Sequence, residues 1–186
     1  PESVVLEFLV KRAGKLSALT VTGGEPLLQA DLEIFLTSVK ELGYLIKLDT
    51  NGSFSKRLES IIKQGLVDYI AMDIKAPLDL YKLVVQTEVE SSAILESMDL
   101  IRSSGKPYEF RTTLFDKVLF SEDIERLKLM LKSGDLYYLQ ECRYQDTLEE
   151  FGTDTGSTSR TDLRAKLNEL LSWGSQNKIH IALRTI

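Results

Sequence analysis

Apolar residues along the chain recur at two spacings, and the two kinds of segment alternate. A helical period predicts helices at 2–13, 31–42, 56–64, 91–104 and 161–173, and a further helix that begins at Ser121 and stops at Gly134. Runs of apolar and β-branched residues predict strands at 16–22, 44–49, 67–74, 108–114, 136–142 and 178–184. In the first helix, the apolar residues that share one face are Val4, Val5, Phe8 and Leu9.

A glycine stands between each predicted helix and the strand that follows it. These glycines are Gly14, Gly43, Gly65, Gly105, Gly134 and Gly174. Glycine is common just past a helix C-terminus because it adopts a positive φ without steric cost. Alternating helices and strands require parallel pairing with right-handed crossovers, which leaves a doubly wound sheet or a (β/α) barrel. Because the chain opens on a helix, we expect one α/β domain over 1–186, a partial (β/α) barrel with parallel strands that lacks its first strand.

Composition narrows the possible classes of function. The 186 residues include 23 basic and 28 acidic ones, with no basic cluster, which argues against binding nucleic acid through a basic surface. No apolar run approaches the roughly 18 to 20 residues that cross a bilayer, and the N-terminus has no signal-peptide profile, so we expect a cytoplasmic protein without membrane partners. A polar segment over 145–160 is expected to be a loop.

The chain has one cysteine and one histidine, Cys142 and His180. It therefore cannot build a disulfide framework or a Cys/His zinc site within one copy. We interpret Cys142 as an inert thiol and His180 as a structural residue.

Polar residues recur where predicted strands end. The segment Gly23-Gly24-Glu25-Pro26 follows the first strand, Asp49-Thr50-Asn51-Gly52 the second, and Asp73-Ile74-Lys75 closes the third, while Arg111 lies within the fourth. In a parallel barrel, the carboxyl ends of the strands and the loops after them carry the active site. We therefore expect these residues on one polar rim.

Each of these features also has a purely structural interpretation. The two glycines suit a tight turn, Asp49 suits an Asx turn into Asn51, and Asp73 with Lys75 suits a buried ion pair. Taken together, the carboxylates and cations would complement a ligand that carries one ammonium and one carboxylate group. The bare backbone at Gly23 and Gly24 would let such a ligand lie close.

The segments TGGEPLLQ, KLDTNG, VDYIAMDIKAP and YEFRTT, in this order and spacing, resemble the radical S-adenosylmethionine superfamily. Within it they are most similar to the activating proteins of glycyl radical enzymes, above all that of the anaerobic (class III) ribonucleotide reductase, with the pyruvate formate-lyase activating enzyme near. The resemblance covers about residues 1–145. It implies that S-adenosyl-L-methionine is cleaved reductively to a 5′-deoxyadenosyl radical. This radical would abstract a hydrogen atom from a glycine of the partner enzyme. An electron donor such as flavodoxin or ferredoxin is implied as a second partner.

The resemblance also implies roles for individual residues. Gly23, Gly24 and Glu25 would hold the methionyl amino group of S-adenosylmethionine, largely through their backbone. The remaining implied cofactor residues are Asp49, Thr50, Asn51, Asp73, Lys75 and Arg111. Of these, Asp49, Thr50 and Asp73 match a monovalent-cation site of the pyruvate formate-lyase relatives, which carry a histidine at about the position of Cys142.

One element of the family pattern is missing from this sequence. Members bind a 4Fe–4S cluster through a CxxxCxxC loop after the first barrel strand, whereas this chain has a single cysteine and no such loop. The resemblance thus implies a chain that is inactive alone. We interpret it as a truncated activating protein, and the alternative is a cluster-less protein that binds S-adenosylmethionine or another protein without chemistry.

A third hypothesis comes from a different class of enzyme. If Lys75 were desolvated inside the barrel, it could form a Schiff base with a carbonyl substrate, as in a barrel lyase or aldolase.

Overall fold

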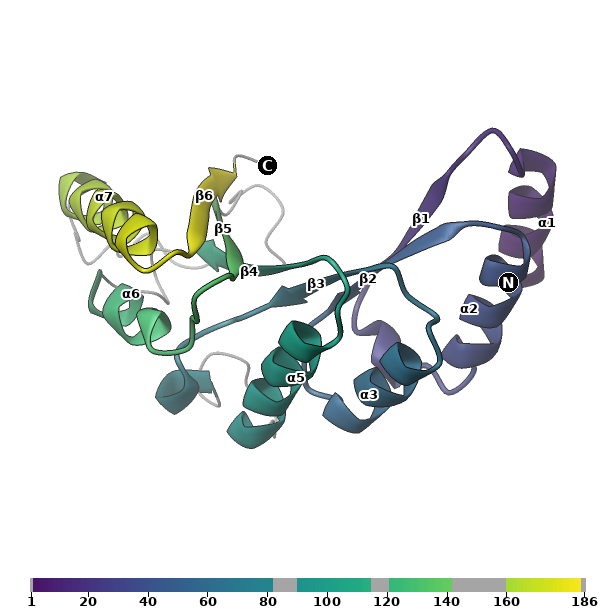
Figure 1. Ribbon diagram of the computed structural model, residues 1–186, viewed down its shortest axis with the longest axis horizontal. Coiled ribbons are helices and arrows are strands. Elements are labelled where there is room, and N and C mark those ends of the chain that lie inside the picture. The colour runs from purple at the N-terminus through teal and green to yellow at the C-terminus, as the bar shows by residue number, and fades with distance from the viewer. Residues whose placement is uncertain (1, 82–89, 115–120, 142–159, 185–186) are drawn as a thin grey trace, which may run out of the picture. The chain divides into compact units, whose positions relative to one another are not determined.

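A computed structural model of the chain describes residues 2–81, 90–114, 121–141 and 160–184 (Figure 1). Cys142 and positions 145–159 of the predicted polar loop lie outside the described residues. Among the helices of this described part, none is long and apolar enough to span a membrane.

The strands confirm the predicted α/β class. In the described residues, six strands form one sheet in chain order: β1 (Ala18–Val21), β2 (Leu45–Thr50), β3 (Tyr69–Asp73), β4 (Tyr108–Leu114), β5 (Leu136–Glu141) and β6 (His180–Arg184). Every pair with a defined register is parallel. Because β1 and β6 stand at opposite ends of this order, the sheet is open, as a partial barrel requires.

The helices also lie where the apolar period predicts them, except that the helix beginning at Ser121 ends at Lys128, short of the stop expected at Gly134. They are α1 (Glu2–Arg12), α2 (Leu32–Glu41), α3 (Ser55–Lys63), α5 (Ser91–Ser103), α6 (Ser121–Lys128) and α7 (Arg160–Gln176). Two short 3-10 helices follow the first and third strands: η1 (Pro26–Leu28) and η2 (Leu78–Leu80). Strand and helix thus alternate along the described chain.

The chain forms two compact units. The first contains Pro1–Asp73 and Ser92–Tyr108, and the second contains Ile74–Ser91 and Glu109–Ile186. The expected single domain over 1–186 stays a prediction, and the two units are described separately below.

In the first unit, one face of the sheet is apolar and the other is polar. Ile46 and Leu48 of β2 are fully buried, whereas Lys47 and Asp49 between them are half-buried. This alternation follows from the two-residue period of a strand. Figure 1 shows α2, α3 and α5 along one side of β2 and β3. The apolar face is therefore the core face, and the other face carries half-buried polar residues.

In the second unit, the core contains a buried polar chain. Phe110 is fully buried on β4, and Tyr137 of β5 donates its hydroxyl to the Thr112 hydroxyl at 2.7 Å. Thr112 in turn donates to the Ile74 carbonyl at 2.8 Å. Burial raises the pKa of Tyr137, so its hydroxyl remains a donor. Each buried hydroxyl is thus hydrogen-bonded, which offsets the cost of burying it.

The apolar face predicted for α1 is mostly exposed. Val4, Val5 and Phe8 are 58%, 43% and 49% exposed, and only Leu9 of this helix is buried. The Leu9 carbonyl accepts a hydrogen bond of 2.7 Å from the hydroxyl of Tyr44. The apolar period predicts the helix correctly but not how much of its surface is covered.

Five of the six predicted glycine positions have a positive φ: Gly14, Gly43, Gly65, Gly105 and Gly134. The prediction for Gly174 is wrong, because α7 continues to Gln176 and Lys178 takes the positive φ of 59°. A Cβ atom at Gly174 would lie 2.6 Å from the Ile181 side chain. That glycine therefore permits close packing of α7 on β6.

Candidate functional site

The double glycine after β1 presents its backbone to open space. Gly23 and Gly24 have φ values of 99° and 55°, and a Cβ atom at either position would meet nothing within 4 Å. The absence of side chains is thus a matter of backbone conformation rather than of crowding by the protein. Both residues are exposed, so a ligand can reach their amide and carbonyl groups.

Glu25 connects this loop to the end of β2. Its carboxylate is buried, with 7% of the residue exposed. Oε1 accepts hydrogen bonds from the Leu27 N–H at 3.1 Å and from the Thr50 hydroxyl at 2.9 Å. Oε2 accepts a bond of 2.6 Å from the Asn51 N–H. Both oxygens of Glu25 are therefore used within the protein, and its carboxylate joins the two loops.

The loop after β2 is held by further local hydrogen bonds. The Thr50 hydroxyl accepts from the Gly52 N–H at 3.1 Å, and the Asn51 side chain accepts from the Ser53 N–H at 2.9 Å. Asn51 therefore forms an Asx turn, and the structural interpretation that gave such a turn to Asp49 stays a prediction.

Gly52 is the most tightly enclosed residue of this loop. It has a φ of 76°, and its carbonyl accepts a hydrogen bond of 2.7 Å from the buried hydroxyl of Ser97 on α5. A Cβ atom at Gly52 would collide with the Met72 side chain. This glycine is therefore required by packing as well as by its backbone conformation.

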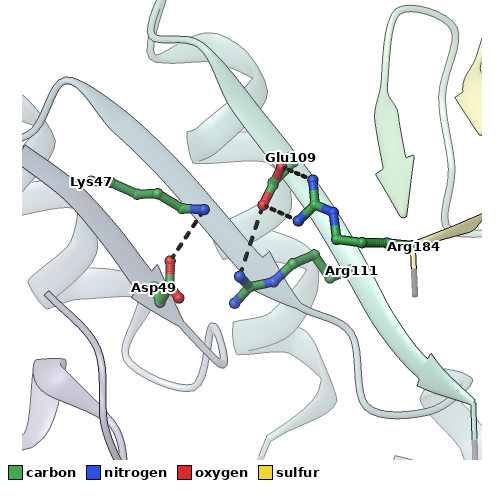
Figure 2. Close-up of polar contacts among 5 residues, drawn as sticks. All are labelled: Lys47, Asp49, Glu109, Arg111 and Arg184. Atoms are coloured by element: carbon green, nitrogen blue, oxygen red, sulfur yellow. Dashed lines mark hydrogen bonds and ion pairs between the residues drawn. The ribbon is translucent and has the colours of Figure 1, made fainter. Parts of the chain in front are cut away.

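Asp49 lies on the polar face of β2, beside Lys47 (Figure 2). Lys47 Nζ is 3.8 Å from Asp49 Oδ1 and 5.3 Å from the centre of the Tyr69 ring. Asp73 ends β3 and is half-buried. Thr50 is buried on the opposite face of β2, where its hydroxyl donates to Glu25. The Thr50 hydroxyl thus lies on the face of β2 opposite to the Asp49 side chain. The cation site expected from Asp49, Thr50 and Asp73 stays a prediction.

Lys75 and Arg111 belong to the second unit. Lys75 is exposed just beyond β3, and its backbone N–H donates to the Tyr81 hydroxyl at 3.2 Å. An exposed lysine keeps its hydration, so the Schiff-base hypothesis loses the desolvation on which it depends. Arg111 is 12% exposed on β4.

No group of three or more His, Cys, Asp or Glu in the described residues is arranged to hold a metal ion.

Arg111 lies beside an ion pair that our sequence interpretation missed, between a buried glutamate and a half-buried arginine (Figure 2). Arg184 of β6 donates to both oxygens of Glu109 at 3.2 and 3.1 Å, and its guanidinium lies 3.8 Å from the Tyr138 ring centre. Arg111 approaches the same carboxylate at 3.8 Å. The hydrogen bond to Glu109 raises the pKa of Arg184. Glu109 and Arg111 stand two positions apart in the same strand, and this spacing was the sequence signal that could have indicated a charged cluster on one face.

His180 contributes to the sheet rather than to a site in the described residues. It is the exposed first residue of β6, and its backbone N–H donates to the Asp135 carbonyl at 2.9 Å. In the first unit, the structure brings Gly23, Gly24, Glu25, Thr50 and Asn51 into one connected group.

Comparison with known proteins shows which family this chain is similar to. The model of the radical SAM superfamily matches residues 1–133. Two proteins of Methanocaldococcus jannaschii, each named "Putative glycyl-radical enzyme activating enzyme", are similar to this chain. The first is 37% identical over 138 residues, which cover 72% of this chain and 58% of that protein. The second is 29% identical over 128 residues, which cover 67% of this chain and 49% of that protein. The chain thus spans about half the length of these relatives.

The fold is also similar to solved structures. The Streptococcus suis protein SuiB, in its crystal structure bound to S-adenosylmethionine, superposes with a TM-score of 0.70 at 15% identity. That match covers 100% of this chain and 43% of SuiB. At this identity the likeness supports the fold alone, a parallel α/β sheet of the same kind.

Proposed function

Because the chain belongs to the radical SAM superfamily, we propose that it forms the S-adenosylmethionine-binding part of a protein that activates a glycyl radical enzyme. The names of the two Methanocaldococcus relatives support activation of such an enzyme. The quoted motifs favour the anaerobic ribonucleotide reductase as the partner, and flavodoxin or ferredoxin as the electron donor. A cytoplasmic location is part of the same proposal.

The observation that carries the proposal is the geometry of the double-glycine loop. Gly23 and Gly24 expose their backbone to open space, while Glu25 fixes the next residues to the end of β2. Carbonyl oxygens in such a loop accept hydrogen bonds from the ammonium group of an amino-acid ligand. The residues therefore fit the methionyl part of S-adenosylmethionine.

Bound S-adenosylmethionine supplies, on reductive cleavage, the 5′-deoxyadenosyl group that takes hydrogen from a glycine of the partner. In our proposal, the residues of this chain bind and orient that cofactor. Gly23 and Gly24 contact its amino group, and Asp49, Thr50, Asn51 and Asp73 border the same site. The cofactor roles of Lys75 and Arg111, which belong to the second unit, stay predictions.

The iron–sulfur cluster of the superfamily does not fit the residues of this sequence. Such a cluster is held by several cysteine thiolates, and these 186 residues include one cysteine. No reaction step is assigned to these residues through the cluster. The same loop geometry also suits the alternative that the chain binds S-adenosylmethionine without cleaving it.

Equilibrium dialysis with labelled S-adenosylmethionine tests the binding step. We expect saturable binding to the wild-type chain and a Kd at least about tenfold higher for Gly24→Val, because a side chain would enter the space of the ligand and strain the backbone. Gly43→Val is the matched control, since Gly43 also has a positive φ and open surroundings but precedes β2. No saturable binding to the wild type, or equal effects of both variants, would contradict the proposal.

Activation is tested on the native gene product, reconstituted with iron and sulfide under anaerobic conditions. With reductant and S-adenosylmethionine, we expect a glycyl radical signal by electron paramagnetic resonance on anaerobic ribonucleotide reductase and none on pyruvate formate-lyase. A signal on pyruvate formate-lyase alone would replace the proposed partner. Binding without formation of 5′-deoxyadenosine would support the cluster-less alternative.

A further inference from the structure

Arg57 of α3 contacts the candidate site although it belongs to none of the quoted motifs. Its Nη1 donates to the Leu27 carbonyl at 2.8 Å, and its Nη2 donates to the Gln29 carbonyl at 2.7 Å. The acceptors belong to the middle residue of η1 and to the residue that follows its last one, just after Gly-Gly-Glu-Pro. One half-buried guanidinium thus holds two backbone oxygens that are about 30 positions away in the sequence.

A helix as short as η1 needs such support. Its three residues make few hydrogen bonds of their own, and the 3-10 geometry is poor. The planar guanidinium has donors in a fixed fork, so it can satisfy two carbonyls at once, and bonds from a charged donor are stronger than neutral ones. Arg57 therefore fixes the end of η1.

Glu25 fixes the beginning of the same segment. Its carboxylate caps η1 through the Leu27 N–H and ties it to Thr50 and Asn51. The segment after the double glycine is thus held at one end by a carboxylate and at the other by a guanidinium. A binding loop that is already ordered loses less entropy when a ligand arrives, which lowers the Kd.

We propose that Arg57 is a positioning residue of the double-glycine loop, which strengthens binding of S-adenosylmethionine without contacting it. This inference rests on the proposed function. It adds to the site a residue from α3, whose role is to hold η1 in the orientation that exposes Gly23 and Gly24.

The test compares Arg57→Gln with Lys40→Gln by equilibrium dialysis, well below the unfolding temperature of each. We expect Arg57→Gln to raise the Kd about tenfold, because two charge-assisted bonds to η1 are lost. Arg57→Lys, which keeps the charge but not the fork, should fall between it and the wild type. Lys40→Gln is the matched control, because it also removes a charged donor in the first unit. Lys40 forms an ion pair of 2.8 Å with Asp68, the residue directly before β3, and does not contact η1 in any bond given above. Its variant should lose stability but keep the wild-type Kd.

Hydrogen exchange supplies a readout that does not depend on the ligand. In Arg57→Gln without S-adenosylmethionine, amides over 23–29 should exchange faster, while those of α2 keep their wild-type rates. An Arg57→Gln variant with the wild-type Kd and exchange, or a Lys40→Gln variant with the same rise in Kd, would overturn the positioning role. Failure of the wild type to bind would instead overturn the proposed function.

Discussion

Among the residues whose burial the structure describes, each unit buries one glutamate, and the two glutamates are stabilised in different ways. Glu25 in the first unit and Glu109 in the second are 7% and 3% exposed. Glu25 accepts its hydrogen bonds from two backbone N–H groups and a hydroxyl. Glu109 accepts two bonds from the guanidinium of Arg184, with Arg111 at 3.8 Å.

The difference shows what each carboxylate organises. Backbone N–H donors occur where the chain turns, so Glu25 shapes two loops beside the candidate ligand. The donor to Glu109 comes from β6, so that pair joins β4 to β6 across the Tyr138 ring of β5. We therefore expect substitutions at the Glu109 pair to lower mainly stability, and substitutions around Glu25 to affect ligand binding as well.

The largest effect is expected for Arg184→Met. It removes two charge-assisted hydrogen bonds to the buried carboxylate of Glu109, while Arg111 still approaches that carboxylate at 3.8 Å, so we expect a loss of about 3 kcal/mol. Urea unfolding of the variant measures this loss. The double variant Glu109→Gln with Arg184→Met should recover part of it, because no carboxylate is then buried. Equal losses in the single and double variants would show that the ion pair is not the source of the effect.

Glu25→Ala should have the next largest effect, about 2 kcal/mol of unfolding free energy. The substitution leaves the Leu27 and Asn51 N–H groups and the Thr50 hydroxyl without their acceptor. Unlike Arg184→Met, it should also raise the Kd for S-adenosylmethionine in equilibrium dialysis. Glu33→Ala on α2 is the control, since within the described residues this half-buried carboxylate accepts a single side-chain hydrogen bond, from Gln64, and is hydrogen-bonded to neither loop. An unchanged Kd for Glu25→Ala would remove the distinction between the two glutamates.

A smaller effect is expected for Thr50→Val, which keeps the shape of the side chain but removes one donor to Glu25. The expected loss is about 1 kcal/mol by urea unfolding, since two hydrogen bonds of the hydroxyl disappear while Glu25 keeps its other donors. Thr50→Ser should retain most of the stability. If the Val variant were as stable as the wild type and the Ser variant less stable, packing of the Thr50 methyl group, and not the two hydrogen bonds, would stabilise this loop.

The sequence predicts the order and type of the elements well because these depend on local patterns. The apolar periods and the glycine stops identify the described strands and α-helices but not the two 3-10 helices or the end of α6, and five of the six glycines have the expected positive φ. The error at Gly174 has a non-local cause, because Ile181 packs against it. The extent of burial on α1 is likewise set by which elements cover Val4 and Phe8, and the helix period does not contain that information.

The sequence also predicts the segments of the candidate site, but not the partners of their side chains. The bond from Thr50 to Glu25 spans 25 positions, and the pair of Arg184 with Glu109 spans 75. No local pattern links residues so far apart, so Glu25 was expected at the ligand and Arg57 was missed. The motifs indicate where strands end, and the long-range contacts depend on how those ends are packed together.

Substitution of Asp68 should lower stability the least, because its carboxylate is half-exposed. This carboxylate accepts hydrogen bonds from both a backbone N–H group and a charged side chain. Its Oδ2 accepts from the Ile46 N–H at 2.7 Å, and Lys40 donates to both oxygens. Burial favours the protonated form, but the bonds from Lys40 and Ile46 outweigh it and lower the pKa of Asp68. A folded pKa below the unfolded one stabilises the protein at neutral pH, and this contribution is lost as pH falls through the folded pKa. Asp68→Asn should therefore cost about 0.5 kcal/mol at pH 7, and the difference from wild type in urea unfolding should shrink below about pH 4. A difference that stays constant down to pH 2 would show that the charge of Asp68 is not what stabilises this end of β2.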